Sequence, residues 1–361
     1  MCIHSLALYL LILFLECPTV VLAAFDTYLC SGGSNSGAVT LTTEDSFLIN
    51  CNMDGMVVFN IAGMDLGTNL KINVEDSDLA RVANVFLHIQ GPATSTTHNF
   101  ITILIARNTL RGPIKFSGFI PQNSLISMVD NSVVEVGDTV HSLFGAPANV
   151  FVAMLLSVLV LRRGSFTMKG NTISTTGTCT SAATWNVFAM SGIYTLSEGA
   201  SIVISNNVGT LSCNGRFYNE FGASSGSIIT SASSLSVSSN QVTLMGPHSA
   251  FFCVFLSMDV LSSGGSLILS LNTVTASSAI TQTSGFISFT SVNALVVSSG
   301  STISIDNNIF TVSTSVATTI NVIFFGVVTV SSLRIVIHHN LIQVVGSTTC
   351  IGVSFTSISI S

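Results

Sequence analysis

The stretch "GSTISIDNNIF", residues 300–310, is the clearest copy of a phrase that recurs along the chain. Glycine and serine open the phrase, apolar and small polar residues alternate through it, and asparagine closes it. Alternation with a period of two is typical of a β-strand that buries one face. The phrase therefore predicts a half-buried strand that ends at a polar corner.

Copies of this phrase return at a nearly fixed spacing in the second half of the chain. The closing residues are Asn171, Asn207, Asn240, Asn272, Asn308 and Asn340, and their numbers differ by 36, 33, 32, 36 and 32. Weaker copies close at Asp76, Asn108 and Asn131, where the spacing is less regular. Self-similarity at such a period indicates stacked structural repeats.

Each repeat holds three strand-like phrases. One follows the asparagine, as in "NTVTA" from residue 272; an apolar one comes next, as in "GFISF" from residue 285; the third is the opening phrase itself. Three short strands in about 33 residues describe one coil of a solenoid. The predicted fold is all-β: a single-stranded parallel β-helix of the pectin-lyase type.

The recurring asparagines are best explained by that coil. Asparagine tolerates the left-handed backbone of a tight corner, and its amide can bond to the copies above and below it. We therefore expect Asn171, Asn207, Asn240, Asn272, Asn308 and Asn340 to form structural corners rather than ligand contacts.

The chain divides into three parts. Residues 1–24 combine an apolar core with small residues at Val21 and Ala23, which predicts a cleaved secretory signal peptide and delivery to the cell surface or the medium. Residues 25–65 are expected to form an N-terminal cap and an irregular first coil, and residues 66–361 the β-helix. The apolar stretch 148–161 is short for a membrane span and is predicted to be two buried strands.

The repeats run to the last residue without a polar cap. An uncapped solenoid presents an unpaired strand edge, which recruits other chains. We expect self-association through this C-terminal edge.

Cysteine usage fits an exported protein. Six of the eight cysteines lie after the predicted signal peptide. Cys179 and Cys213 follow corner asparagines by similar distances, which puts them on adjacent coils within reach of a disulfide. Cys30 and Cys51 are a second candidate pair that would pin the cap, and the oxidising compartment permits both.

The composition offers little for catalysis. Charged residues make up 7% of the chain, the net charge is −6, and the mean hydropathy is +0.71. The negative charge argues against nucleic-acid partners. Acidic residues gather only at Glu44 with Asp45 and at Glu75, Asp76 and Asp78. The second group, in "NVEDSD", lacks the glycine spacing of a calcium loop, and we interpret it as a solvated turn. No catalytic, cofactor-binding or metal-binding residues are predicted.

Two residues deserve separate mention because they resemble catalytic groups. His338 and His339 stand in the phrase "IVIHHN", close to Arg334. One is expected to face outwards and the other to line a corner, so both are interpreted as structural.

The phrases "GGSLILSLNTVT" and "GSTISIDNNIFTV", the signal-like start and the low-charge Ser/Val/Asn-rich composition resemble the dispersed gene family surface proteins of trypanosomes. That resemblance covers most of residues 40–361. It implies β-helical ectodomains of membrane-anchored proteins with a suspected role in adhesion, and no catalytic residues. This chain is much shorter than members of that family and has no apolar segment after the repeats, which would make it an N-terminal fragment or a truncated member.

The sequence as a whole predicts a non-catalytic, secreted or cell-surface β-helix that makes adhesin-like contacts with host or extracellular ligands, either protein or glycan. The alternative is a degenerate carbohydrate-active β-helix related to polysaccharide lyases or hydrolases, which would need paired carboxylates on one face of the coil.

Overall fold

The computed structural model describes the strands and corners of the chain. The described residues are 26–29, 34–35, 39–41, 46–49, 51–53, 57–60, 70–79, 87–90, 101–110, 114–117, 123–135, 150–156, 159–175, 184–190, 194–212, 214–220, 227–245, 251–255, 258–277, 284–289, 295–297, 300–313, 319–330, 334–345 and 349–360. Strands and turns account for this part of the chain, and no helix occurs in it.

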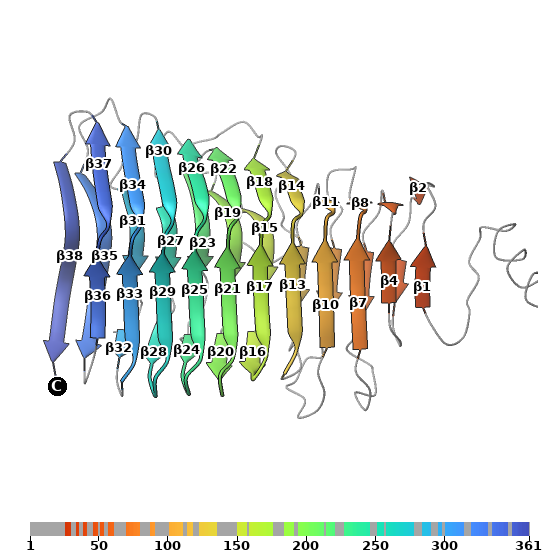
Figure 1. The fold of residues 1–361 in the computed structure, drawn as a ribbon, viewed down its shortest axis with the longest axis horizontal. Coiled ribbons are helices and arrows are strands. Elements are labelled where there is room, and N and C mark those ends of the chain that lie inside the picture. Colours follow the sequence, from red (N-terminus) through yellow and green to blue (C-terminus); the bar gives the residue numbers. More distant parts are fainter. Residues whose placement is uncertain are drawn as a thin grey trace, which may run out of the picture.

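The strands stack in parallel into three long sheets that wind around one axis (Figure 1). Sheet A contains the recurring phrase. In stacking order it consists of β1 (Asp26–Leu29), β4 (Ser46–Ile49), β7 (Leu70–Glu75), β10 (Ile101–Ala106), β13 (Leu125–Val129), β17 (Ser165–Lys169), β21 (Ser201–Ser205), β25 (Ser234–Ser238), β29 (Ser266–Ser270), β33 (Thr302–Asp306) and β36 (Arg334–His338).

Sheet B holds the strands that follow the closing asparagine. It consists of β2 (Ser34–Asn35), β5 (Asn52–Met53), β8 (Asp78–Leu79), β11 (Thr109–Leu110), β14 (Ser132–Glu135), β18 (Thr172–Thr175), β22 (Val208–Ser212), β26 (Gln241–Met245), β30 (Thr273–Ser277), β34 (Ile309–Ser313) and β37 (Leu341–Val345).

Sheet C closes the coil with two rows of strands. One row is β3 (Val39–Leu41), β6 (Val57–Asn60), β9 (Leu87–Gln90), β12 (Ile114–Ser117), β15 (Val150–Leu156), β19 (Thr184–Met190), β23 (Asn214–Glu220), β27 (Phe251–Phe255) and β31 (Ser284–Phe289). The other row is β16 (Leu159–Arg162), β20 (Tyr194–Ser197), β24 (Ser227–Ile229), β28 (Met258–Leu261) and β32 (Leu295–Val297). Both rows join at β35 (Thr319–Val330), which pairs with β38 (Thr349–Ile360).

The all-β parallel solenoid predicted from the repeat period is thus confirmed. One detail of the prediction was wrong: the regular coils carry four strands rather than three. The extra strand, such as β28 in "MDVL", directly precedes the recurring phrase and is too short to show a clear alternation.

Two ranges of the sequence are placed by this topology. The apolar stretch 148–161 contains the strands β15 and β16, as expected of paired strands rather than of a helix. Strands between residues 26 and 60 already pair in parallel with the three sheets, so the stacking extends into the range that the sequence assigned to the N-terminal cap. Residues 1–24, the predicted signal peptide, lie outside the described residues.

The core lies between the three sheets. It consists of inward side chains that occupy the same register position on successive coils. Ile202, Leu235, Leu267 and Ile303 occupy equivalent inward positions of sheet A and are fully buried. Because each removes its apolar surface from water, each contributes about 1.5–3 kcal/mol of transfer free energy before the cost of ordering the chain. The alternating pattern of the recurring phrase places every second side chain in this core.

Rings from sheet C stack in the same core. The ring centroid of Phe289 lies 4.7 Å from that of Phe255 and 4.7 Å from that of Phe325, with interplanar angles of 9° and 1°. This distance matches the ~4.8 Å spacing between neighbouring strands, because each ring belongs to a successive coil. The stacked coils therefore align identical side chains in columns.

Candidate functional site: inner ladders and outer faces

The corner asparagines form one continuous hydrogen-bonded ladder. In the middle of it, the Asn207 backbone N–H and side-chain Nδ2 both donate to Oδ1 of Asn240, at 3.0 and 2.9 Å. Asn240 repeats the arrangement with Asn272, and its Nδ2 also donates to the backbone carbonyl of Ile204 at 3.0 Å. The same pattern links Asn108, Asn131, Asn171, Asn207, Asn240, Asn272, Asn308 and Asn340.

These side chains face the interior rather than solvent. Asn171, Asn207, Asn240, Asn272 and Asn308 are fully buried. A buried amide needs its donors and acceptor satisfied, since an unpaired one costs about 1–3 kcal/mol. The ladder supplies these partners within the protein, so its asparagines are structural.

The left-handed backbone lies one residue earlier than predicted. Gly170, Asn206, Leu271 and Asn307 have φ values of 71°, 56°, 58° and 55°, and each directly precedes a ladder asparagine. The asparagine was expected to occupy the left-handed position itself, and this was wrong. Its role is to accept and donate hydrogen bonds, while the preceding residue makes the turn.

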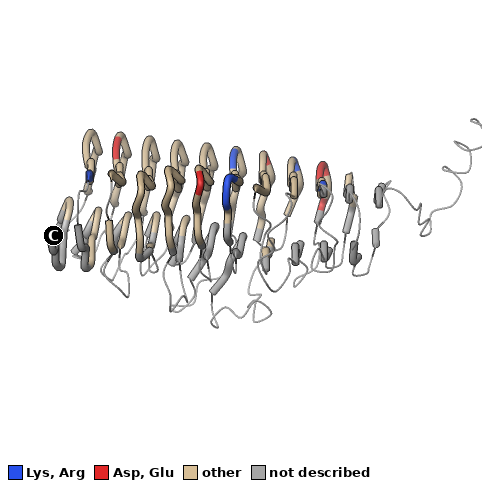
Figure 2. Tube along the Cα trace, turned by 90° about the horizontal axis from the view of Figure 1, so that it is seen from below, with Lys and Arg blue, Asp and Glu red and all other residues tan. Residues whose placement is uncertain are grey.

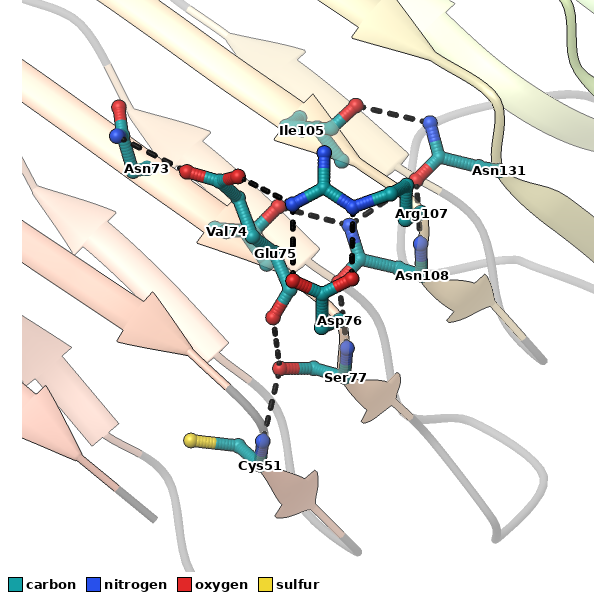
Figure 3. A network of polar contacts seen from close by, with 10 residues as sticks. All are labelled: Cys51, Asn73, Val74, Glu75, Asp76, Ser77, Ile105, Arg107, Asn108 and Asn131. Atoms are coloured by element: carbon teal, nitrogen blue, oxygen red, sulfur yellow. Dashed lines mark hydrogen bonds and ion pairs between the residues drawn. The ribbon is translucent and has the colours of Figure 1, made fainter.

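The ladder continues towards the N-terminus with other residue types (Figure 3). Ser77 takes the asparagine position: its backbone N–H donates to Asn108 Oδ1 at 3.0 Å, and its hydroxyl donates to the Glu75 carbonyl at 2.8 Å. The Cys51 N–H donates to the Ser77 hydroxyl at 2.9 Å. The weak sequence copy that closes at Asp76 is therefore displaced by one residue from the structural corner.

The two acidic side chains at this corner form ion pairs with one arginine from the next coil. Arg107 Nε and Nη2 bind both oxygens of Asp76 at 2.7 and 2.8 Å, and Nη2 also binds Glu75 Oε2 at 2.7 Å (Figure 3). The hydrogen bond from Arg107 lowers the pKa of Asp76 below its usual value. The arrangement is an ion-pair cluster on the outside of a corner.

A second cluster of this kind lies further along the solenoid. Arg162 forms an ion pair with Glu198, and Arg163 Nε lies 2.8 Å from Glu198 Oε2. The hydrogen bond from Arg162 lowers the pKa of the Glu198 carboxyl. Arg162 and Glu198 are 36 residues apart, one repeat, so the period brings them together on adjacent coils.

The two histidines both lie at an exposed corner. His338 ends β36, and His339 has the left-handed φ of 52° that precedes the ladder residue Asn340. Their ring centroids are 4.7 Å apart. His339 therefore makes the corner, and His338 points outwards. Among the contacts that the structure describes, neither histidine lies beside a pair of carboxylates.

The candidate disulfide cysteines are only partly described. Cys51 is buried and disulfide-bonded. Cys30, Cys179 and Cys213 lie outside the described residues, so the two predicted pairings stay predictions.

Within the described strands and corners, no group of three or more His, Cys, Asp or Glu side chains is arranged to hold a metal ion. The same residues contain no helix long and apolar enough to span a membrane.

The outer face of sheet A is dominated by hydroxyl groups. We define the sheet A face as the outward positions of β17, β21, β25, β29 and β33, which alternate with buried ones. Hydroxyls occupy most of them: Ser165, Thr167, Ser201, Ser234, Ser236, Ser238, Ser266, Ser270, Thr302 and Ser304. Ser205 shares their register but is buried. The remaining positions hold Val203, Ile268, Lys169 and Asp306.

The outer face of sheet B differs in character. We define the sheet B face as the outward positions of β18, β22, β26, β30, β34 and β37. Its middle column consists of Ser174, Thr210, Thr243, Thr275 and Thr311 in strict register, followed by Gln343. The flanking outward positions hold exposed apolar side chains at Val208, Met245, Ile309, Leu341 and Val345, and exposed polar ones at Thr172, Gln241, Thr273 and Ser313.

Charged residues are sparse along the described coils (Figure 2). On the sheet A face they are Lys169 and Asp306, which lie on separate coils. On the sheet B face the described outward positions hold none. The surface that these faces offer is long, repetitive and nearly neutral, which suits contact with another extended surface better than enclosure of a small molecule.

Sequence reasoning missed the ion-pair clusters and the threonine column. The sequence contains a pattern that could have revealed each of them, because the residues involved are about one repeat apart. Thr210, Thr243, Thr275 and Thr311 each follow a ladder asparagine by three residues, so aligning the repeats at the asparagine reveals the column.

In comparisons with known proteins, no protein-family model, no curated protein and no solved structure matches the chain.

Proposed function

We propose that this protein is a non-catalytic contact protein of the cell surface or the extracellular medium, and that it binds an extracellular glycan or protein through the sheet A face. The observation that carries the proposal is the five-strand array of hydroxyls in register on that face. Hydroxyls both donate and accept hydrogen bonds, so they can pair with polar groups of many ligands.

The physical basis of such binding is repetition. Neighbouring rows of the array are ~4.8 Å apart, and outward side chains along a strand recur every ~6.6 Å. Individual hydroxyl contacts are weak, because each replaces a hydrogen bond to water and contributes about 0.5–1.5 kcal/mol net. A ligand that follows the array makes many of them at once, as an adhesive surface requires.

Several features of the sequence support the extracellular setting. The signal-like residues 1–24, the candidate disulfides and the resemblance to trypanosome surface proteins all favour export. A member of that family, or a fragment of one, would display the β-helix outside the cell.

The proposal is tested with the full chain secreted from a eukaryotic host and applied to arrays of glycans and extracellular-matrix proteins. Ser236→Arg places a large cation in the centre of the sheet A face, and it should weaken binding at least tenfold, about 1.4 kcal/mol. Thr243→Arg, on the sheet B face of the same coil, is the matched control and should leave binding within about twofold.

Two outcomes contradict the proposal. Equal loss of binding in both variants would mean that the sheet A face is not the contact surface. Turnover of a glycan that disappears when one carboxylate is replaced would support the carbohydrate-active alternative instead.

A further inference from the structure

The sheet B face combines three properties that are rarely found together on a free surface. Its described outward positions carry no charge, its middle column contains four in-register threonines, and large apolar side chains occupy five of the positions that flank that column. Val208, Met245, Ile309, Leu341 and Val345 are 47%, 44%, 41%, 56% and 55% exposed. They make up more than half of the exposed large hydrophobic side chains in the described part of the chain. Such a patch marks an interaction site.

From these properties we infer that the sheet B faces of two copies of this protein pack against each other and form a dimer with two-fold symmetry. The inference concerns a different face from the one proposed for ligand binding, so either can hold without the other.

The first argument is side-chain shape. The middle column repeats threonine at one fixed spacing over four strands, and such a column interdigitates with an equal column of a second copy, as in the dry interfaces between paired β-sheets. Thr, Val and Ile are short and branched, and they fit the ~10 Å separation at which sheets pack face to face. A second copy presents columns with the same spacing, because they come from the same repeats.

The second argument is charge. The chain has a net charge of −6, so two copies repel each other over most of their surface. The sheet B face is the exception, since none of its described outward positions is charged. The sheet A face carries Lys169 and Asp306 and lacks this property.

The third argument concerns the alternative occupant of this face, a small molecule or a sugar. Binding sites for small molecules and sugars usually include aromatic side chains that pack against the ligand. No described outward position of the sheet B face holds an aromatic residue; the flanking side chains are aliphatic or small and polar, apart from Met245 and Gln241. The face therefore suits a protein sheet better than a sugar ring.

The size of the face sets the expected strength. Six strands at ~4.8 Å spacing and about five residues of ~3.3 Å each give a face of roughly 29 by 17 Å. Two such faces bury about 1,000 Å², which is at the low end for specific protein interfaces. The dimer should therefore be weak and depend on concentration.

The proposal is tested by sedimentation velocity of the full secreted chain over a range of concentrations. Thr243→Lys places two cations near each other across the two-fold axis and should weaken dimerisation at least a hundredfold. Ser236→Lys, on the sheet A face of the same coil, should leave the dimer unchanged. Thr243→Val keeps the shape of the column and should preserve the dimer, which would show that the charge of the lysine, and not the loss of the threonine, weakens dimerisation.

Solution X-ray scattering separates this dimer from association through the C-terminal edge. Face-to-face packing doubles the thickness of the particle where the two faces meet, whereas end-to-end stacking doubles its length and leaves its thickness unchanged. A monomer at all accessible concentrations, a dimer that survives Thr243→Lys, an end-to-end particle, or a monomer that binds neutral glycan through the sheet B face would each overturn the inference.

Discussion

Asn207 and Asn240 are 33 residues apart in the sequence, yet the Asn207 side-chain Nδ2 donates to Oδ1 of Asn240 at 2.9 Å in the buried corner of adjacent coils. The same bond recurs from coil to coil. Each amide forms hydrogen bonds with the coil before it and the coil after it. The ladder therefore fixes the register of each coil relative to its neighbours.

Replacing an asparagine in the middle of this ladder should be costly. Asn240→Ala removes the acceptor of two Asn207 donors and the donor to the Ile204 carbonyl, all in a buried site. We expect a loss of about 3 kcal/mol or more in the free energy of unfolding, measured by urea denaturation. Asn340→Ala is the control, because Asn340 is only partly buried; it should cost about 1 kcal/mol. Equal costs at the two positions would contradict the structural role of the ladder.

The phenylalanine stack predicts a second large effect. Phe289→Ala leaves a cavity between Phe255 and Phe325 and should destabilise the protein by about 3–5 kcal/mol. Phe289→Leu keeps most of the volume and should cost less than about 1.5 kcal/mol. Denaturant unfolding of both variants checks the prediction, and a similar cost for Leu and Ala would show that volume is not what the site requires.

Leu271 is expected to be a site where substitution stabilises the protein. It has a left-handed φ of 58°, which is unfavourable for a leucine, and its side chain is 59% exposed. Leu271→Asn should raise the free energy of unfolding by about 0.5–1 kcal/mol, because asparagine tolerates this backbone and little packing is lost. Ile268→Asn, in an extended strand nearby, should bring no gain. A stability loss at Leu271 would mean that its side chain packs more than its exposure indicates.

The Arg107 cluster predicts a dependence on pH. Arg107 lowers the pKa of Asp76 in the folded protein below 3.8, so the ion pair stabilises the fold above that pH and loses its effect as the pH falls through the folded pKa. Arg107→Gln should therefore lower the urea midpoint modestly at pH 7 and leave it unchanged in strong acid.

Lys169→Gln removes an exposed cation elsewhere and should show no such pH dependence. If the difference between Arg107→Gln and the unmodified protein were the same at both pH values, the ion pair would not be its cause.

Much of the architecture was predictable because the coils of a solenoid repeat, and each repeat appears in the sequence as the same pattern at a nearly fixed spacing. The alternation in "GSTISIDNN" identifies which side chains enter the core, and the return of asparagine every 32–36 residues identifies the coil. The short strands of sheet C, such as β28 and β32, were not predictable, since three or four residues carry too little pattern to distinguish a strand from a loop.

The outer faces were less accessible to sequence reasoning. Hydroxyl-rich outward positions were expected in general, but the distinction between the sheet A face and the sheet B face depends on which strand each residue joins. Glu198 stands apart from other acidic residues in the sequence, and the pairing of coils places Arg162 and Arg163 beside it.

The sequence by itself determined the period, the inward side chains and the buried asparagine at the end of each phrase, because these are local patterns repeated at a fixed interval. The tertiary structure decided that the residue before each asparagine makes the turn, that arginines form ion pairs with the acidic side chains of the corners, and that the threonine column and exposed aliphatic side chains share one uncharged face. These features arise from the stacking of coils, which brings into contact residues that are one repeat apart and that no local pattern connects.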